Sequence, residues 1–479
     1  MNKNVSLKIT PRSEDFSKWY NDIIEKCDLA EHAPVKGCMI IKPYGYAIWE
    51  KFQSILDKLI KNEGVQNAYF PLFIPKSFLE KEKEHVEGFS PEVAVVTHAG
   101  GKKLEEPLVV RPTSETIMYD AYSRWIKSYR DLPLLINQWA NVVRWEKRPR
   151  LFLRTTEFLW QEGHTAHATH EEALEMALKM LNVYNHFVRE YLAVPVILGQ
   201  KSESEKFAGG VSTYSFEWMT QDGKALQAGT SHLLGQNFAK VFNVQFLDKD
   251  NQQQFVHQTS WGVTTRMIGG LIMTHSDDKG LRLPPKIAPI QIVIIPIYKT
   301  AEEKKDILAT INKIKTELSN FAIKIDNDDN KSPGWRFNEW EQKGVPIRLE
   351  FGPKDLAKNQ IVVFRRDLGQ KQTAALSELT QLIPTLLDSI QSNLFADAQK
   401  YMQQKTHYLD DWDQFKNILE TNPGFIYSHW CGNPECEKSI TEITKATIRN
   451  IPFDSKEEHG KCIKCGSRSE RRVLFAKSY

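Results

Sequence analysis

Chemically active side chains gather between residues 142 and 164 of this 479-residue chain. The segment reads as two strands joined by a loop, K-R-P-R, that is too charged to be buried. Arginine, carboxylate, indole and imidazole groups on one face of a hairpin make a poor hydrophobic core and a good binding site. For an isolated hairpin, a salt-bridged sheet surface is the simpler alternative. Alternation places on this face Val142, Arg144 and Glu146 from the first strand, and Phe152, Arg154, Phe158, Trp160, Glu162 and His164 from the second.

A hydroxyl and a carboxylate lie at a second predicted junction. The stretch R-P-T-S-E-T ends a strand and begins a helix, so Thr113 and Glu115 fall on the turn between them. Helix capping alone can explain this pattern, because Thr or Ser caps a helix and an early Glu meets the positive end of its dipole. The functional alternative is that both side chains hold a small cationic ligand.

Two further segments place polar groups beside glycines. In Q-A-G-T-S-H, a loop loosened by glycine, Gln227, Thr230 and His232 suit a ligand that approaches the backbone. In S-W-G-V-T-T-R-M-I-G-G, Arg266 ends an apolar strand, and the two glycines let the following helix pack closely. An arginine at the end of a buried strand is costly unless an anion meets it, so Arg266 predicts an anionic ligand.

The C-terminal region holds four cysteines at the spacings of zinc knuckles. The segments C-G-N-P-E-C and C-I-K-C-G contain Cys431, Cys436, Cys462 and Cys465. Four thiolates suit tetrahedral zinc with no open coordination position, which predicts a structural ion. Unliganded buried thiols are an alternative, and a pair of disulfides is disfavoured in a reducing compartment.

Composition and patterning bound the class of protein. The length suggests two to four domains, and the net charge of +3 means that nucleic acid would have to bind to local basic patches. We expect a cytoplasmic protein without a membrane segment, because no secretory signal is visible and no apolar run approaches the roughly 18 residues of a membrane span. A proline-rich linker at 281–289 precedes an alternation of strands and helices, which predicts a small α/β domain.

An apolar strand is predicted over residues 65–75, V-Q-N-A-Y-F-P-L-F-I-P. Its two prolines cannot donate to a ladder, so the strand should lie at the edge of a sheet. An apolar edge strand needs a partner. A dimer interface and a covering local loop explain it equally well.

Together these motifs resemble the prolyl-tRNA synthetases, one family of class II aminoacyl-tRNA synthetases. Arg144-Trp145-Glu146 with its basic loop resembles motif two of the class, residues 262–266 with the Gly-Gly helix resemble motif three, and residues 64–75 resemble motif one, the dimerisation strand. The resemblance covers essentially the whole chain and points to the archaeal- and eukaryotic-like branch. The segments that resemble this family in particular are R-P-T-S-E-T, F-L-W-Q-E-G-H-T-A-H, E-K-F-A-G-G, Q-A-G-T-S-H and S-W-G-V-T-T-R.

The resemblance implies a fold class and a division into three domains. Residues 1–283 would form an α+β catalytic domain, in which helices flank an antiparallel sheet of six or seven strands. Residues 284–395 would form an α/β anticodon-binding domain. Residues 396–479 would form a small α+β domain that contains zinc. The family also implies a homodimer.

Residue roles follow from the same resemblance. Arg144 would grip the ATP α-phosphate and the proline carboxylate, and Arg266 would meet the outer phosphates, so these two are the expected catalytic residues. The expected ATP-binding residues are Arg144, Glu146, Arg154, Gln227, Thr230 and Arg266. The expected proline-binding residues are Thr113, Glu115, Arg144, Trp160, Glu162, His164, Phe207 and His232. One departure is visible, because Thr156 replaces a residue that is basic in many relatives.

In the α/β domain, the resemblance assigns anticodon reading to Glu341, Arg348 and Lys354. A carboxylate can accept hydrogen bonds from a guanine edge, and cations can meet its O6 and N7 atoms. Ordinary surface charges are the alternative for these three residues.

The implied activity is that of a proline–tRNA ligase, which joins L-proline to tRNA(Pro) with ATP and Mg²⁺. A carboxylate must attack a phosphate, and arginines and Mg²⁺ lower the repulsion between these two anions. One alternative is a non-catalytic tRNA-binding paralogue, but such proteins typically lack a motif-two or motif-three arginine, and both are present here. A class II ligase for another small amino acid is the other alternative.

Bacterial-type members of this family carry a large editing insertion, and the sequence leaves no room for one between Gln161 and Gln227. We therefore predict that the correction of mischarged tRNA occurs in trans. The purified chain should leave alanyl-tRNA(Pro) intact, as measured by the release of alanine over time. Hydrolysis faster than in a protein-free control would contradict this prediction.

Overall fold

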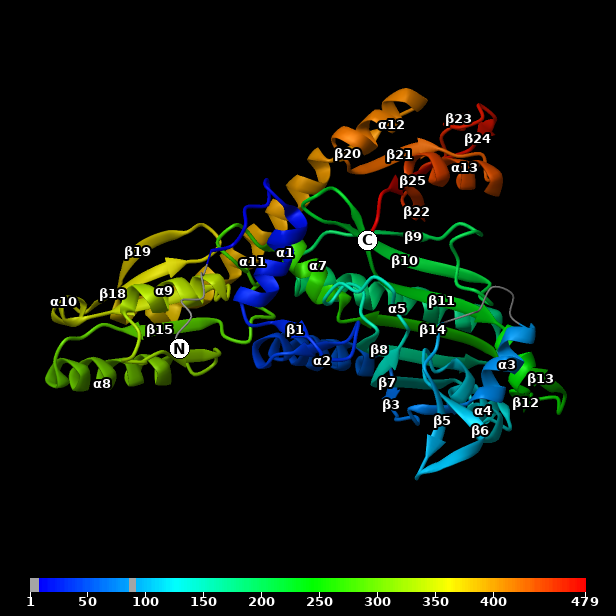
Figure 1. The fold of residues 1–479 in the computed structure, drawn as a ribbon, viewed down its shortest axis with the longest axis horizontal. Coiled ribbons are helices and arrows are strands. Elements are labelled where there is room, and N and C mark those ends of the chain that lie inside the picture. The colour runs from blue at the N-terminus through cyan, green and yellow to red at the C-terminus, as the bar shows by residue number, and fades with distance from the viewer. Residues whose placement is uncertain (1–7, 86–91) are drawn as a thin grey trace.

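The structure, a computed structural model, describes residues 8–85 and 92–479. Figure 1 shows one long twisted sheet with helices against it, a separate α/β unit on the left, and the C-terminal strands at the upper right. No helix in the described ranges is long and apolar enough to cross a membrane.

Among the described residues, the central sheet contains eleven strands. The strands of this sheet that lie between residues 66 and 264 agree with the expected six or seven strands. Neighbouring strands among them pair antiparallel, except for β3 and β7 at the outer edge, which pair parallel. In spatial order these strands are β3 (Gln66–Asn67), β7 (Leu134–Val143), β8 (Glu157–His167), β14 (His257–Thr264), β11 (Ala225–Gly235), β10 (Ser212–Met219) and β9 (Ile197–Gln200).

The sheet then continues into the C-terminal region, which the sequence did not predict. Strand β22 pairs antiparallel with β9, so the C-terminal unit extends the central sheet and does not merely lie against it. The added strands are, in spatial order, β22 (Thr447–Pro452), β25 (Arg472–Ala476), β21 (Phe425–His429) and β20 (Thr406–Tyr408).

The long helix α5 (His170–Glu190) covers one face of the central sheet. The Ser231 hydroxyl on β11 donates a hydrogen bond of 2.7 Å to the Ala177 carbonyl on this helix. Because successive residues of a strand point to opposite faces, Thr230 and His232 point away from α5. The face opposite α5 is therefore the one on which polar residues can form a binding site.

Helix α7 (Arg266–His275) packs closely enough to require its two glycines, as predicted. A Cβ atom at Gly269 would lie 2.6 Å from Leu153, and one at Gly270 would lie 1.6 Å from Trp218. The remaining elements of this half are α1 (Phe16–Lys26), β1 (Ala30–His32), β2 (Met39–Ile41), α2 (Pro43–Asn62), β4 (Phe73–Pro75), α3 (Lys76–His85), β5 (Val95–Ala99), β6 (Lys102–Val110), α4 (Glu115–Trp125), α6 (Asn237–Phe242), β12 (Gln245–Leu247) and β13 (Gln253–Phe255).

The predicted hairpin over residues 142–164 is correct only in part. Strand β7 ends at Val143 and β8 begins at Glu157, so Arg144, Glu146, Phe152 and Arg154 lie in the connecting loop. Their predicted alternation along strand faces is therefore wrong.

The physical reason lies within the loop itself. Pro149 has no N–H to donate to a ladder, and Phe152 adopts a left-handed backbone conformation with φ of 61°, which a strand cannot contain. The backbones of Arg150 and Arg154 instead close the loop with hydrogen bonds of 2.7 and 2.9 Å. Beyond the loop, the second strand follows the prediction.

The predicted apolar strand over residues 65–75 is divided between two sheets. Its first part, β3, forms the edge of the central sheet, as predicted. Its last part, β4, pairs with β6 in a separate three-stranded sheet of the described chain. The intervening residues, which include Pro71, leave the ladder and expose Tyr69, and Phe73 at the start of β4 is exposed as well; the exposed fractions of the two are 72% and 47%.

The predicted α/β unit is confirmed and is built around a five-stranded sheet of described residues. Two of its inner strands, β15 and β17, are buried throughout, as strands covered on both faces should be. The strands, in spatial order, are β16 (Ile323–Ile325), β15 (Ile292–Pro296), β17 (Ile347–Phe351), β18 (Gln360–Arg365) and β19 (Gln370–Ala375), and the helices are α8 (Ala301–Glu317), α9 (Pro333–Gln342) and α10 (Pro353–Ala357).

Helix α11 (Leu379–Gln404) leads from the α/β unit into the C-terminal unit. It runs through residue 395, where a boundary between the two was expected. The other C-terminal elements are α12 (Trp412–Thr421), α13 (Pro434–Thr444), β23 (Gly460–Lys461) and β24 (Arg468–Ser469).

A buried ion-pair network joins the C-terminal unit to the rest of the central sheet. Glu217 on β10 is fully buried, and its carboxylate accepts hydrogen bonds of 3.1 and 3.0 Å from Arg449 on β22 and of 3.2 Å from Lys201. Burial alone would raise the pKa of Glu217, but the charges of Arg449 and Lys201 outweigh it and lower the pKa below its ordinary value. The carboxylate therefore stays ionised and binds the two units together.

Replacing Arg449 with Met should destabilise the chain, because Glu217 would keep its charge in a buried site with only Lys201 as a partner. We expect a loss of about 3 kcal/mol in urea unfolding followed by tryptophan fluorescence. The control is Arg468→Met, which removes an exposed arginine of the same unit. The double variant E217Q/R449M should recover much of the loss, and equal stability of R449M and R468M would contradict the prediction.

Candidate active site

A cavity of about 350 Å³ opens on the sheet face opposite α5. It brings together every residue expected to bind ATP or proline except Glu146. The predicted residues that line it are Thr113, Glu115, Arg144, Arg154, Trp160, Glu162, His164, Phe207, Gln227, Thr230, His232 and Arg266.

The antiparallel register of four strands builds the floor of this cavity. His164 on β8 lies opposite Ser260 on β14, Ser260 lies opposite His232 on β11, and His232 lies opposite Thr213 on β10. Two residues away on the same face, Glu162 on β8 lies opposite Gly262 on β14. The absence of a side chain at Gly262 leaves space above the sheet next to this carboxylate.

The buried carboxylate of Glu162 is the centre of a hydrogen-bond network. Its Oε1 atom accepts hydrogen bonds of 2.5 Å from the Ser114 hydroxyl and 2.9 Å from the Gln138 amide, and its Oε2 atom lies 3.1 Å from Nε2 of His164. The Tyr119 hydroxyl lies 3.0 Å from the other ring nitrogen of His164. Burial alone would lower the pKa of His164, but the hydrogen bond to Glu162 and the nearby carboxylates raise it above its ordinary value.

His232 differs from His164 in the direction of its pKa shift. Its ring nitrogens lie 2.9 Å from the hydroxyls of Thr213 and Thr230, and the ring of Phe207 lies 4.6 Å away between centroids. Burial, together with the positive charge of His164, lowers the pKa of His232 to about 3. This side of the cavity therefore contains a neutral imidazole beside aromatic surface.

Helix capping does not account for the pattern at residues 113–115. Ser114 is the N-cap of α4, but its side chain makes no capping hydrogen bond and donates to Glu162 instead. Thr113 donates its hydroxyl hydrogen bond to the Glu115 carboxylate, and both side chains are almost fully buried at the cavity wall. Two carboxylates, from Glu115 and Glu162, thus face one end of the cavity.

Three arginines, Arg144, Arg154 and Arg266, face the cavity, and no carboxylate of the described residues accepts a hydrogen bond from Arg144 or Arg266. Arg144 donates to the Pro112 carbonyl at 2.9 Å, with its guanidinium over the Trp160 ring at 5.5 Å. Arg266 donates to the carbonyls of Leu153 and Gln227 at 3.0 and 3.4 Å.

The charge of this arginine cluster is only partly balanced. Burial, and then the charges of Arg154 and Arg144, lower the pKa of Arg266 to about 10, so it stays protonated at neutral pH. Glu146, which lies outside the cavity lining, is 3.7 Å from the Arg154 Nε atom. A cluster of cations held mainly by neutral carbonyls predicts an anionic ligand with several charges.

The unusual residue Thr156 supports the loop from within. It is buried, its carbonyl accepts a hydrogen bond of 2.8 Å from the Arg144 backbone, and its own N–H donates to the Gly37 carbonyl at 2.8 Å. Gly37 has a φ of 86°, and a Cβ atom there would lie 2.2 Å from the Thr156 hydroxyl. Thr156 and Gly37 therefore fit each other, and this threonine positions Arg144 without reaching into the cavity.

Sequence reasoning missed several residues of the cavity. Lys201, Glu205, Thr213, Ser260 and Thr264 line it, although the sequence analysis assigned none of them a chemical role. Glu205, Ser260 and Thr264 lie within the segments E-K-F-A-G-G and S-W-G-V-T-T-R, so the motifs could have indicated them. For Thr213 the available signal was its strand partner, which tertiary structure decides.

The Tyr479 ring also comes close to the basic loop. It lies 5.1 Å from the Arg150 guanidinium, whose other side faces the Tyr20 ring at 4.7 Å. The Tyr479 hydroxyl donates to Asp222 at 2.6 Å. The last residue of the chain thus packs against the loop that follows Arg144.

The side chains of the three residues expected to read the anticodon differ in how exposed they are. Arg348 is almost fully buried and is 2.9 Å from the Glu350 carboxylate, whereas Lys354 is exposed at the start of α10. Glu341 lies at the end of α9, and its carboxylate is 3.8 Å from Arg348. The structure thus brings Glu341 and Arg348 together.

The four C-terminal cysteines form one cluster, in which all sulfur atoms lie within 4.8 Å of one another. Tetrahedral zinc at the usual Zn–S distance of about 2.3 Å separates its sulfur ligands by roughly 3.8 Å. The Cys431 and Cys465 sulfurs are 3.7 Å apart, which fits this geometry. Glycines at positive φ shape both knuckles, at Gly432 and Gly466.

Comparisons with known proteins agree with this geometry. Three family models match the chain, described as the tRNA synthetase class II core domain (G, H, P, S and T) over residues 97–275, an anticodon binding domain over 291–386, and the prolyl-tRNA synthetase C-terminal domain over 412–479. The proline–tRNA ligase of Phocaeicola vulgatus is 56% identical over 99% of this chain and all of that protein. The chain belongs to the prolyl-tRNA synthetase family.

Other relatives have similar extents. The proline–tRNA ligase of Natranaerobius thermophilus is 53% identical over 100% of this chain and 99% of that protein. A crystal structure of prolyl-tRNA synthetase from Cryptosporidium parvum, complexed with halofuginone and AMPPNP, superimposes with a TM-score of 0.94 at 45% identity and covers 99% of this chain and 100% of that one. The class II core, the anticodon-binding unit and the C-terminal unit of this chain thus have the arrangement found in that structure.

The buried neutral state of His232 predicts a dependence of stability on pH. The folded chain keeps this ring neutral down to a pKa of about 3, whereas the unfolded chain takes up the proton near its ordinary pKa of 6.5. Stability is therefore fully present above about pH 6.5 and is lost as the pH falls towards 3. Between pH 7 and pH 5 this one group should remove about 2 kcal/mol.

The measurement is urea unfolding at both pH values for the natural chain and His232→Asn. The variant should lose less stability between pH 7 and pH 5, because asparagine does not titrate. Substitution of His98, an exposed histidine on β5, should leave the difference unchanged. An unaltered pH difference in the His232 variant would show that this residue is not the titrating group.

Proposed function

We propose that this chain is a proline–tRNA ligase, which activates L-proline with ATP to prolyl-adenylate and then transfers proline to the 3′ end of tRNA(Pro). The observation that carries this proposal is the division of one cavity into two ends. Carboxylates and a raised-pKa histidine form one end, and three arginines form the other. A substrate with a cationic amine and a carboxylate, placed beside a triphosphate, fits both ends.

At the arginine end, Arg144 would hold the ATP α-phosphate together with the proline carboxylate, so that these two anions meet. Arg154 and Arg266 would neutralise the outer phosphates, while Gln227 and Thr230 lie on the nucleotide side. Catalysis of this kind needs positioning and charge stabilisation and no protein nucleophile. Glu146 lies at the rim beside Arg154, where it can read the adenine amino group.

At the carboxylate end, Glu115 and Thr113 would accept the protonated imino group of proline. Trp160, Glu162, His164, Phe207 and His232 would enclose the ring. A pocket recognises each methylene of such a ring with only about 1–3 kcal/mol, so alanine and cysteine should be incompletely excluded.

We propose that Mg²⁺ enters with ATP. The four cysteines form the only candidate metal cluster of three or more ligands among the described residues, so the phosphates themselves would supply most Mg²⁺ ligands in the cavity. When bound, Mg²⁺ would supply positive charge that offsets the negative charge of the phosphates as pyrophosphate leaves. The four cysteines would hold zinc, whose role there is to stabilise the C-terminal unit.

The remaining assignments rest on the family. The domain division at 1–283, 284–395 and 396–479 is supported by the three family models, each of which lies within one of these ranges. Glu341, Arg348 and Lys354 would read the proline anticodon. A homodimer is supported by the exposed Tyr69 and Phe73 next to the edge strand β3.

Two further assignments concern location and alternatives. Six free thiols suit a reducing compartment, which supports a cytoplasmic location. The paralogue hypothesis is disfavoured because Arg144 and Arg266 both face the cavity. A ligase for another small amino acid is disfavoured by the identity of the relatives.

Amino-acid-dependent ATP–pyrophosphate exchange, measured with each of the twenty amino acids, tests the activity. Proline should give the largest signal. Arg144→Ala should reduce the proline signal at least about 100-fold, because it removes the cation shared by the two reacting anions. An exposed arginine on α4, Arg124, provides the matched control for this substitution. A proline signal no larger than that of alanine or threonine would contradict the proposed proline–tRNA ligase activity.

Metal analysis of the purified chain tests the zinc site. One zinc ion per chain is expected, and Cys465→Ser should lower the zinc content and the thermal stability of the C-terminal unit. Cys38→Ser is the control, because Cys38 lies outside the cluster. Equal zinc content in the two variants would exclude the four-cysteine site.

A further inference from the structure

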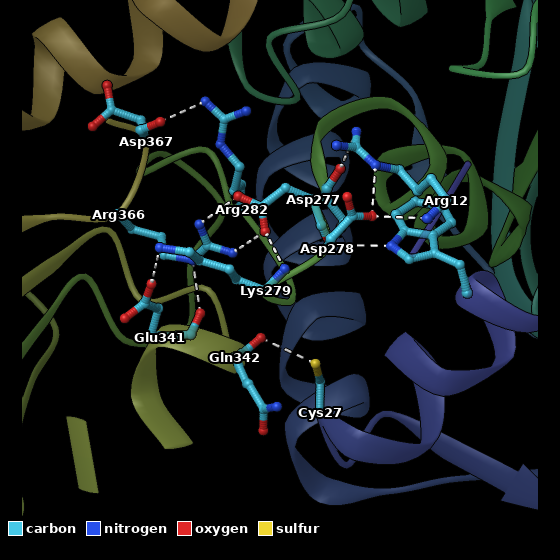
Figure 2. A network of polar contacts seen from close by, with 12 residues as sticks. Arg12, Cys27, Asp277, Asp278, Lys279, Arg282, Glu341, Gln342, Arg366 and Asp367 are labelled. Atoms are coloured by element: carbon cyan, nitrogen blue, oxygen red, sulfur yellow. Dashed lines mark hydrogen bonds and ion pairs between the residues drawn. The ribbon is translucent and has the colours of Figure 1, made fainter. Parts of the chain in front are cut away.

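Two turns, residues 277–281 and 341–344, are in close contact (Figure 2). The first belongs to the catalytic half, the described residues before 284, and the second to the α/β unit, and we call their contact the seam. A Cβ atom at Gly280 would lie 2.4 Å from the Gln342 carbonyl oxygen, and one at Gly344 would lie 2.6 Å from Leu281. Both glycines have positive φ, at 136° and 72°. The two backbones are therefore in direct contact, and no side chain separates them.

The catalytic half satisfies the carbonyls at the end of α9, which lack partners within the helix. The Gln342 carbonyl accepts hydrogen bonds of 2.8 Å from the Leu281 N–H and 3.0 Å from the Cys27 thiol. The Lys343 carbonyl accepts one of 2.8 Å from the Tyr44 hydroxyl. The end of α9, and with it Glu341, is thus held against the catalytic half.

A buried arginine, Arg366, also holds the backbone of Glu341 in place. Arg366 donates its Nε hydrogen bond to the Glu341 carbonyl at 2.7 Å, and its two terminal nitrogens donate to the Asp277 carboxylate at 2.8 and 2.6 Å. Figure 2 shows Arg366 between these two partners. Such a bidentate pair fixes orientation as well as distance. Residues 277–279 of the catalytic half are therefore fixed relative to Glu341.

The Glu341 carboxylate itself remains available to a ligand. Its nearest cations are Lys279 Nζ at 3.4 Å and Arg348 NH1 at 3.8 Å, both longer than a charge-assisted hydrogen bond of about 2.8 Å. No hydrogen bond of the described residues uses its side-chain oxygens. The exposed fractions of the Lys279 and Glu341 side chains are 68% and 18%, so solvent screens the lysine and the ion pair is weak.

We propose that Lys279, a residue of the catalytic half, is part of the anticodon-binding site. In this arrangement one anticodon guanine donates from N1 and its 2-amino group to Glu341, and its neighbouring O6 atom accepts from Lys279. We assign the contact to this O6 atom to Lys279 and not to Arg348, because the Arg348 guanidinium is buried and bonded to Glu350 and to the Phe337 carbonyl. The inference rests on the proposed anticodon role of Glu341 and adds a specificity-determining residue from another unit.

The experiment measures kcat/KM for the aminoacylation of tRNA(Pro) transcripts. Each guanine of the anticodon is replaced in turn by adenosine, which reverses the hydrogen-bonding edge, or by inosine, which lacks only the 2-amino group. Lys279→Ala is compared with Lys286→Ala, a second seam lysine, whose ion pair is with Glu190. ATP–pyrophosphate exchange without tRNA reports separately on the proline site.

Lys279→Ala should lose about tenfold in kcat/KM with the natural anticodon, and its preference for guanine over adenine should fall about tenfold at one position. Its sensitivity to inosine should persist, because Glu341 still meets the 2-amino group. Lys286→Ala should stay within about twofold of the natural chain, since exposed ion pairs contribute little. Behaviour of K279A indistinguishable from that of K286A would overturn the proposal.

Glu341→Gln separates the failure of this proposal from that of the anticodon role. If E341Q loses the response to inosine and adenosine at one position while K279A retains full discrimination, only the role of Lys279 is wrong. If E341Q discriminates as well as the natural chain at both positions, Glu341 does not read the anticodon, and both assignments fall.

Discussion

The antiparallel pairing of β8 with β7 and β14 is the constraint on which the site depends. It places Gln138 and Gly262 on either side of Glu162, so that one neighbour donates a hydrogen bond and the other leaves space. A slip by one residue would turn Glu162 towards α5 and bring Gln161 to the cavity. Gln161 is instead bonded to Tyr184 on α5, which holds the register from the opposite face. The same ladder thus separates a closed face from a binding face.

Charge is distributed over this face in an unusual way. Ser114, Gln138 and His164 hold the buried carboxylate of Glu162, and neutral carbonyls hold Arg144 and Arg266, so no hydrogen bond joins this carboxylate to either arginine. Positioned charges of this kind cost stability in the absence of a ligand and stabilise complementary charge when it arrives. The opposite pKa shifts of His164 and His232 follow from the same separation, because only one ring has a carboxylate partner.

The outer units are attached to this sheet through buried polar contacts and not only through linkers. Arg449 reaches Glu217 from the C-terminal unit, and Arg366 reaches Asp277 from the α/β unit. Helix α7 begins with Arg266 at the cavity and ends just before Asp277 at the seam. One short helix therefore joins the arginine cluster to the place where the α/β unit is held.

Local patterns determined those features that depend on neighbouring residues. Proline and most glycine positions marked turns, alternation placed Phe158, Trp160, Glu162 and His164 on one face, and cysteine spacing indicated the four-cysteine cluster. The loop expected around Gly229 was wrong, because these residues pair on both sides as part of strand β11. Arg266 was correctly expected between a strand and a helix, and Thr113 and Glu115 at the start of another. Each of these depends on backbone preferences within a few residues, which the sequence expresses directly.

Only the tertiary structure decided which distant segments meet. The extension of the sheet from β9 to β22, the contact of Thr156 with Gly37, and the approach of Lys279 to Glu341 all join residues that no local pattern relates. The same is true of Thr213, which reaches the cavity because of its strand partner. The loop at 144–156 was misjudged for the related reason that its conformation depends on Phe152 and on packing against residue 37. Strand partners and loop packing depend on contacts between distant residues, and a single sequence expresses these only through the folded chain.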